Sequence, residues 1–363
     1  MIIKSNIVSI YTFIVFLIFL FLLNERLYLS YGEHSGIYNS YVSMIIVLAL
    51  LLGCFFCKTV FSLQEIILFI LIVSLITLNG VVKNGYIEET ARYLINLSII
   101  FLSSKFHFSS LPTLAKIIII DGLVCHYLFP TSFIGERATG FFLTTPTNFS
   151  LIILISIVII IESMKHTNQS FESVLFFCLV SLYLIYASET RSVLLFFVLY
   201  LFYKLVRQAY RSESKGLRIL VIALFLLIIP FSYSFVLQLV NQRTDGYAST
   251  STRLLLYEAI LTNLRNHPVS WFFGNGTGTA YNLTISMIGI KFPPHFDFLA
   301  ILHDLGIVMI IGGTFFFKRI YNHLYLVVIG LVILANFHNL IFFPIGLTYI
   351  CMLWSYLDYL NDL

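Results

Sequence analysis

Long apolar runs alternate with short polar connections along most of the chain. A helix that crosses the hydrocarbon core of a bilayer needs about 20 mostly apolar residues, and roughly twelve runs approach that length. They cover residues 7–23, 40–57, 63–79, 88–103, 113–129, 147–163, 171–187, 190–207, 217–238, 297–315, 322–336 and 338–356. The pattern predicts an all-α integral membrane protein with about twelve transmembrane helices.

One long polar segment, residues 239–296, interrupts this pattern. Polar residues at 249–252 lead into an amphipathic helical pattern that Pro268 ends. GNGTG at 274–278 predicts a turn and not a phosphate loop, because no strand precedes it and no G-K-[ST] follows. The predicted organisation is therefore nine helices within residues 1–238, a loop with an amphipathic helix at 239–296, and three helices within 297–363.

The cations of the short loops predict the orientation, because cytoplasmic loops carry an excess of lysine and arginine. One face collects Lys4, Lys58, Lys105, Lys165, Lys204, Arg207, Arg211, Lys215, Arg218, Lys318 and Arg319. This face is predicted to be cytoplasmic, and the even number of helices places both termini there. The long polar segment then lies outside.

Composition supports the membrane class and limits the partners. The 363 residues are 59% hydrophobic and 10% charged, whereas soluble domains carry roughly 25% charged residues. The formal net charge of +4 is too small and too scattered for nucleic acid. All five cysteines lie in apolar runs, so no disulfide framework is expected. No small-residue cleavage site follows the first run, which predicts a retained helix.

The predicted outer face carries mainly arginine, whereas the cytoplasmic face carries mainly lysine. The outer set is Arg26, Arg92, Arg137, Arg191, Arg243, Arg253 and Arg265, with Lys83 and Lys291. Lysine would satisfy topology equally well, but the planar guanidinium binds phosphate oxygens in pairs. The arginine bias therefore indicates phosphate recognition outside, with interfacial anchoring as the alternative for individual residues.

Two outer arginines lie at predicted helix starts. Arg137 precedes the sixth run, where Thr145, Thr147 or Asn148 can cap the helix and Pro146 suits its first turn. An outward helix start exposes amides suited to an anion. Arg191 lies in a very short turn between two runs, with Glu189 and a substrate diphosphate as alternative partners.

The long polar segment contributes Arg243 and Arg253. Arg253 falls in the first turn of the amphipathic helix, and Tyr257, Ile260 and Leu264 follow at helical spacing. We expect this helix to lie across the outer mouth of the bundle. Arg253 suits either a phosphate or a membrane-surface anchor.

A cluster of histidines and acids lies near the C-terminal runs. His295 and Asp297 precede the tenth run; a neutral imidazole can take a proton from a sugar hydroxyl, and a carboxylate can orient it. His303 and Asp304 follow about two helical turns later, but no third ligand is spaced to complete a metal site with them. His338, between the last two runs, is predicted to line the outer cavity or to pack between helices.

Four motifs follow one another along the chain: ERATGFFLTTPTNFS (136–150), ETRSVLLFF (189–197), TRLLLYEAILTNLRNHPVSWFFGNGTG (252–278) and PPHFDFLAILHDLG (293–306). In this order they resemble the O-antigen polymerase and O-antigen ligase group of membrane glycosyltransferases. The resemblance implies a bacterial inner-membrane protein with one long periplasmic loop late in the chain and an Arg-Arg-His set facing the periplasm.

The same resemblance implies residue roles. Arg191, Arg253 and His295 match the catalytic set, and Arg137 matches an additional arginine near the undecaprenyl-diphosphate donor. The candidate substrate-binding residues are Arg137, Arg243, Tyr257, Asp297 and His338. Glycan transfer would need no metal and no cofactor, since the arginines stabilise the departing diphosphate. We expect inversion at the anomeric carbon, because no carboxylate nucleophile is positioned for two displacements.

Three functions compete. A polymerase would transfer the glycan to another lipid-linked repeat unit, whereas a ligase would transfer it to lipid A-core. A flippase or transporter of lipid-linked oligosaccharide predicts repeated halves and charges in the middle of the bilayer; the chain has no visible duplication and mainly Asp121 there. The expected partners are an undecaprenyl-diphosphate-linked oligosaccharide, membrane lipid and, as a candidate, a polysaccharide chain-length regulator.

Overall fold

The computed structural model describes residues 14–25, 36–57, 59–83, 85–106, 108–129, 137–142, 145–164, 166–167, 169–211, 216, 223, 250–288, 297–321, 323, 325–336 and 343–362. Within these helices, the side chains at 36–40, 57, 211, 250–253, 287–288, 335–336 and 362 are not described. The predictions for Arg243, His295 and His338 therefore lie outside the described residues, as does the side chain of Arg253.

Most of the described residues are helical and none of them forms a strand, so the predicted all-α class is confirmed. The bundle helices are α2 (Gly36–Cys57), α3 (Leu63–Val82), α4 (Ile87–Ser103), α5 (Leu111–Leu128), α6 (Pro146–Ser163), α7 (Phe171–Ala187), α8 (Arg191–Arg211), α13 (Asp297–Ile320), α14 (Leu326–Asn336) and α15 (Pro344–Asp362). Three further helices come before α13: α10 (Thr250–Asn266), α11 (Pro268–Phe273) and α12 (Thr279–Ile288).

Five of these helices, α3, α5, α6, α8 and α13, are long and apolar enough to cross a membrane. Shorter apolar helices cover Ile14–Leu23, Tyr41–Phe56 and Phe171–Ala187. A membrane class is thereby supported. The count of about twelve spans stays a prediction, since residues 217–238 fall almost wholly outside the described part.

Local sequence signals explain several helix starts. Ser62 accepts the N–H of Glu65 at 3.3 Å, and the Glu65 carboxylate accepts the N–H of Ser62 at 2.7 Å, which forms a capping box for α3. Ser170 caps α7 by accepting the N–H of Ser173. Pro268 begins α11 directly after α10 ends, as its position in the sequence predicts.

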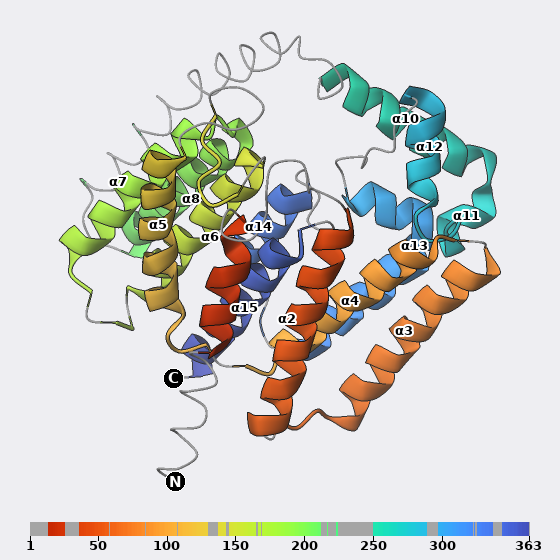
Figure 1. The fold of residues 1–363 in the computed structure, drawn as a ribbon, viewed down its shortest axis with the longest axis horizontal. Helices are drawn as coiled ribbons and strands as arrows, with labels where there is room; N and C mark the ends of the chain where they lie inside the picture. The colour runs from red at the N-terminus through yellow and green to blue at the C-terminus, as the bar shows by residue number, and fades with distance from the viewer. Residues whose placement is uncertain are drawn as a thin grey trace.

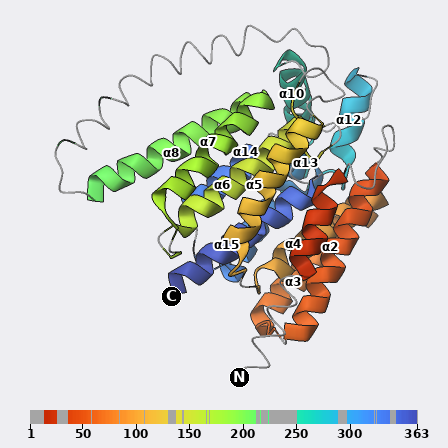
Figure 2. The same ribbon diagram turned by 60° about the vertical axis from the view of Figure 1, so that its left-hand side comes forward.

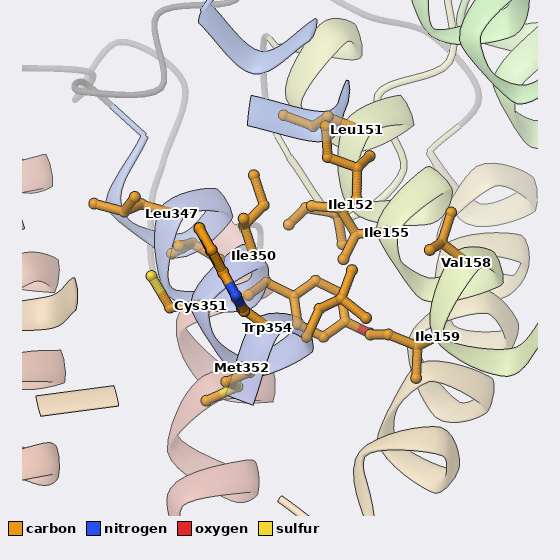
Figure 3. Packing of buried hydrophobic residues seen from close by; sticks show 14 of the residues in the cluster. Leu151, Ile152, Ile155, Val158, Ile159, Leu347, Ile350, Cys351, Met352 and Trp354 are labelled. Carbon is orange, nitrogen blue, oxygen red and sulfur yellow. The ribbon is translucent and has the colours of Figure 1, made fainter. Parts of the chain in front are cut away.

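The core of the bundle is built around α6. Its side chains from Leu151 to Ile155 and from Ile157 to Ile160 are fully buried, which matches a helix that is apolar on all faces. α6 packs against α5, α7 and α15. Figure 3 shows the α6 side chains facing those of α15, and the hydroxyls of Ser156 and Tyr349 lie 3.0 Å apart within this contact.

The helices form two groups joined by α15. One group contains α2, α3, α4 and α13, and the other contains α5, α6, α7 and α8 (Figures 1 and 2). α15 contacts both α4 and α6, so it connects the groups. α10, α11 and α12 gather at one end of the bundle, beside the start of α13 (Figure 1).

A second, smaller hydrophobic core lies at this end. Ile260 and Leu264 of α10 and Leu299 of α13 form it, and Tyr257, Leu261, Trp271, Leu283 and Leu302 pack around it. We call α10, α11, the turn at 274–278 and α12 the helical cap, which packs on the start of α13. Gly306 breaks α13 with φ 78° and ψ 175°, so the predicted tenth run does not form one straight helix.

Candidate functional site

Arg137 is tied to the turn between α7 and α8. Its Nε atom donates to the carbonyl oxygen of Ser188 at 2.9 Å, and Nη2 donates to Oγ1 of Thr190 at 3.3 Å. The N–H of Ala138 donates to the carbonyl oxygen of Ala187 at 2.9 Å. Arg137 and Ala138 thus donate to carbonyl groups at the C-terminal end of α7, where the helix has no N–H groups of its own left to pair with them.

The turn itself brings two helix starts together. Glu189 has φ 53°, a left-handed conformation that reverses the chain within a few residues. Thr190 is buried and precedes α8, where its carbonyl oxygen accepts the N–H of Leu194. Oγ1 of Thr190 also lies 3.5 Å from the carbonyl oxygen of Pro146 in the first turn of α6. The start of α8 therefore abuts the start of α6.

Arg191 opens α8 at this junction. Its side chain is half-buried, and its Nη1 atom is buried without a hydrogen-bond partner among the described residues. Glu189 is exposed and forms no ion pair with it, so the structure does not support the expected alternative of a Glu189–Arg191 pair. A buried guanidinium N–H without an acceptor is unfavourable, and an anion in this position would satisfy it.

The start of α6 provides a second polar atom without a partner in the described part of the chain. Thr145 occupies the N-cap position, as the sequence predicts, but its side chain makes no capping hydrogen bond. Its ψ of 75° departs from the extended ψ of about 150° that Ser62 and Ser170 adopt as caps. Oγ1 of Thr145 is buried beside the first turn of α6, and no described group bonds to it.

Two further residues of the predicted site, Tyr257 and Asp297, lie in the cap or beside it. Tyr257 is half-buried and packs against the small core of the cap, while Leu254 and Leu255 are exposed. A helix, α10, forms where the sequence predicts one, with Arg253 in its first turn; its amphipathic character stays a prediction. Asp297 begins α13 and is 2% exposed, so this carboxylate is enclosed and does not face an open surface.

Asp297 belongs to a buried group of acids beneath the cap. Burial raises the pKa of the Tyr281 phenol, and the negative charges of Glu89, Asp297 and Asp304 raise it further, while Arg92 lowers it. Nη1 of Arg92 lies 2.6 Å from the Glu89 carboxylate. Arg92, an outer arginine by sequence, is thus held in a partly buried ion pair.

The predicted turn at 274–278 is confirmed, and it contacts residues that the sequence did not connect with it. Gly274, Gly276 and Gly278 all have positive φ. The turn packs on His303 and Asp304, both of which are 2% exposed. The roles of Tyr93, Asn263 and Asn275 in these contacts were missed. The sequence did contain one signal for these contacts, the His303-Asp304 pair inside an apolar run. Because polar groups buried at such a position require partners, the pair indicated that hydrogen-bonding residues lie nearby.

Other features lie apart from the arginine pair. Among the described residues, no group of three His, Cys, Asp or Glu side chains is arranged to hold a metal ion. An apolar pocket of about 310 Å³ lies between α3 and α13, beside Lys83 and Phe273. The arginine pair lies instead with α6, α7 and α8, in the other helix group (Figure 2).

Comparison with known proteins supports the resemblance seen in the motifs. No curated protein and no solved structure matches the chain significantly. A family model covers the stretch that runs from α7 through the cap into α13 and includes Arg191, Arg253 and Asp304. Residues 176–317 match this model, which is described as O-antigen ligase, in agreement with the polymerase and ligase family that the four sequence motifs resemble.

Proposed function

We propose that the protein is an O-antigen polymerase, which transfers a glycan from undecaprenyl diphosphate to the non-reducing end of another lipid-linked repeat unit. The family match supports an enzyme of the O-antigen polymerase or ligase type. One observation carries the proposal further: Arg137 is bonded to the residue that precedes Arg191, and Arg191 keeps a buried guanidinium nitrogen without a partner among the described residues.

The junction of α6 and α8 has the chemistry of a diphosphate site. The donors suited to phosphate oxygens are two guanidinium groups, the first amides of α6 and Oγ1 of Thr145, to which no described group bonds. Negative charge develops on the leaving diphosphate as its bond to the sugar breaks. Donors that are already in place stabilise that charge without reorganising, which is where most of the rate acceleration should arise.

The remaining roles follow from the family resemblance. The acceptor hydroxyl attacks the anomeric carbon, the carbon–oxygen bond to the diphosphate breaks, and undecaprenyl diphosphate leaves. His295 takes the hydroxyl proton or positions the acceptor, and Arg253 adds a third positive charge at the donor. Attack opposite to the leaving group inverts the anomeric configuration, and the reaction uses neither metal nor cofactor.

The other candidate residues would contact or support the substrate. Arg243, Tyr257 and His338 are assigned to the donor or acceptor glycan. Asp297 lies two residues after His295 and is buried, so we assign it to holding the chain that presents His295. About twelve spans would place both termini in the cytoplasm and residues 239–296 in the periplasm. A chain-length regulator is the candidate protein partner.

A reconstituted reaction tests the proposal directly. The purified full chain, in lipid nanodiscs, is given synthetic undecaprenyl-diphosphate repeat units, and chain elongation is followed by gel and mass spectrometry. The wild type should elongate, and Arg191→Ala should not. Arg319→Ala is the matched control, because Arg319 is exposed and bonds to Gln64, away from the arginine pair. Absence of elongation by the wild type would refute the polymerase.

Ligation is the second candidate, favoured by the description of the matching family. The same preparation with lipid A-core as acceptor distinguishes the two enzymes. A ligase would form glycosylated core and leave repeat units unelongated. A flippase, in contrast, would move the labelled lipid between leaflets and form no glycosidic bond in either assay.

A further inference from the structure

The break in α13 exposes two carbonyl groups that the turn at 274–278 uses. In an unbroken helix, the carbonyl oxygens of His303 and Asp304 would accept N–H groups from four residues further along. Instead, they accept the N–H groups of Asn275 at 2.8 Å and Gly276 at 3.0 Å. The kink at Gly306 is therefore a docking point for the cap.

The backbone segments around Gly274 and Gly306 approach so closely that neither position has room for a side chain. A Cβ atom on Gly274 would collide with the carbonyl oxygen of Asp304, and one on Gly306 would collide with that of Phe272. Both glycines also have positive φ, at 67° and 78°. The backbone of the turn and the backbone of the broken helix thus interlock.

The carboxylate of Asp304 completes this junction. Oδ2 accepts the N–H of Gly278 at 2.6 Å, and Oδ1 accepts the N–H of Ala280 at 2.9 Å and the hydroxyl of Thr279 at 3.2 Å. Tyr93 of α4 donates its hydroxyl to Oδ2 at 3.2 Å. Asp304 therefore caps the start of α12 from another helix and ties it to the bundle.

His303 extends the junction to α10. Its Nδ1 lies 3.2 Å from Oδ1 of Asp304, and its Nε2 lies 3.1 Å from Oδ1 of Asn263. The amide of Asn275 donates to the same Asn263 oxygen at 3.3 Å. The two side chains of this His-Asp pair thus connect α4, α10, α12 and α13.

We infer that Asp304 is a positioning residue for the transfer reaction. Asp304 holds the turn at 274–278 and the start of α12 on the bundle, and His303 links this contact to α10. Together they fix where the first turn of α10, which carries Arg253, lies relative to the Arg137–Arg191 pair. This role rests on the proposed function. Asp304 is buried and fully engaged by its donors, so it acts through the cap and does not touch the substrate.

The carboxylate cannot be replaced by its amide without loss. Each of the five contacts of Asp304 is to a group that can donate. An amide would turn one acceptor oxygen into a donor and face it toward main-chain N–H or hydroxyl donors. Asp304→Asn should therefore loosen the cap while the apolar bundle stays intact.

Kinetics in the nanodisc assay give the first test. Asp304→Asn should lower kcat for elongation by about 100-fold. The donor KM should change much less, because the Arg137–Arg191 pair still binds the diphosphate and only the contribution of Arg253 is displaced. Thr279→Ala, which removes one donor, is a milder second variant. Asp358→Asn is the matched control: it alters a buried acid that bonds to Tyr325 in another helix pair and should leave kcat unchanged.

A crosslink measures the position of the cap without reference to activity. Oγ1 of Thr90 on α4 and Oγ1 of Thr277 in the turn lie 2.6 Å apart, so cysteines at both positions can form a disulfide. Crosslinking of Thr90→Cys/Thr277→Cys should be fast, and adding Asp304→Asn should slow it about tenfold. Once formed in that triple variant, the disulfide should restore kcat.

The outcomes separate this inference from the proposed function. Slower crosslinking together with disulfide rescue supports positioning by Asp304. Unchanged crosslinking, or lost activity that the disulfide does not restore, overturns it. If the wild type transfers no glycan, the proposed function fails, and the crosslinking rate still decides whether Asp304 holds the cap.

Discussion

The Nη2 atom of Arg137 lies 3.3 Å from Oγ1 of Thr190, the residue that precedes Arg191. This contact brings together two arginines from different parts of the chain at the start of α8. They differ in their surroundings: Arg137 donates to the carbonyl oxygen of Ser188, whereas Nη1 of Arg191 is buried with no acceptor among the described residues. The first therefore serves the fold as well as the proposed site, whereas the second has a guanidinium nitrogen that the described residues leave without an acceptor.

Replacing Arg191 should separate activity from stability. Arg191→Gln should lower kcat for elongation by about 100-fold, because a donor aimed at the leaving group is lost. The melting temperature of the purified protein should not fall, since the variant removes an unsatisfied buried N–H. Arg191→Lys should recover little, because an ammonium cannot reproduce the planar fork. A large drop in melting temperature for Arg191→Gln would contradict this assignment.

Arg137→Ala should reduce both the stability of the protein and its binding of the diphosphate donor. It leaves the carbonyl oxygen of Ser188 and the hydroxyl of Thr190 without their charged donor, which should reduce stability by about 2 kcal/mol. Thermal unfolding in detergent, compared with Arg319→Ala at an exposed position, measures the loss. Addition of the diphosphate donor should raise the melting temperature of the wild type more than that of Arg137→Ala. Equal shifts would remove Arg137 from the binding site.

The glycine at the break in α13 should tolerate no side chain. Gly306→Ala forces a left-handed residue and a collision with the carbonyl oxygen of Phe272, so it should lower stability by more than about 2 kcal/mol. Gly312 lies in the same helix, and a Cβ added there would meet no described atom within 4 Å. Gly312→Ala should be neutral or slightly stabilising. Similar melting temperatures for the two variants would refute the close backbone contact between the turn at 274–278 and the break in α13.

Much of the bundle could be predicted from the sequence, because apolar runs alone identify membrane helices. The predicted run 147–163 corresponds to α6 at Pro146–Ser163, and 171–187 to α7 at Phe171–Ala187. The helix that ends before Pro268 was equally accessible from the spacing of its apolar residues and from the proline. These features depend on hydrophobic periodicity and on proline, both of which act locally.

The contacts between distant segments could not be predicted in this way. The pairing of Arg137 with the α7–α8 turn depends on how α6 packs against α7 and α8, and no local signal encodes it. The break at Gly306 was hidden by the apolar residues on both sides of it. Asp304 finds its donors in the turn at 274–278 and on α4, so its partners become visible only in three dimensions.

Lys83 should secure the cap from the side of α3. Its Nζ atom donates to the carbonyl oxygens of Phe273, at 2.9 Å, and Gly274. Lys83→Met should therefore slow the crosslinking of Thr90→Cys/Thr277→Cys by roughly tenfold, since two bonds from a charged donor are lost. Lys318→Met, at an exposed position in the last turn of α13, is the matched control.

The same lysine should make the stability of the protein depend on pH. Burial lowers the pKa of Lys83, so between the folded and the unfolded pKa the unfolded chain binds more protons. The contribution of Lys83 to the free energy of unfolding should then rise with pH through that window. It should reach its maximum above a pH of about 10.4, the usual lysine pKa. The difference in melting temperature between the wild type and Lys83→Met should widen accordingly. A difference that narrows toward high pH would show that the ammonium is not desolvated at this junction.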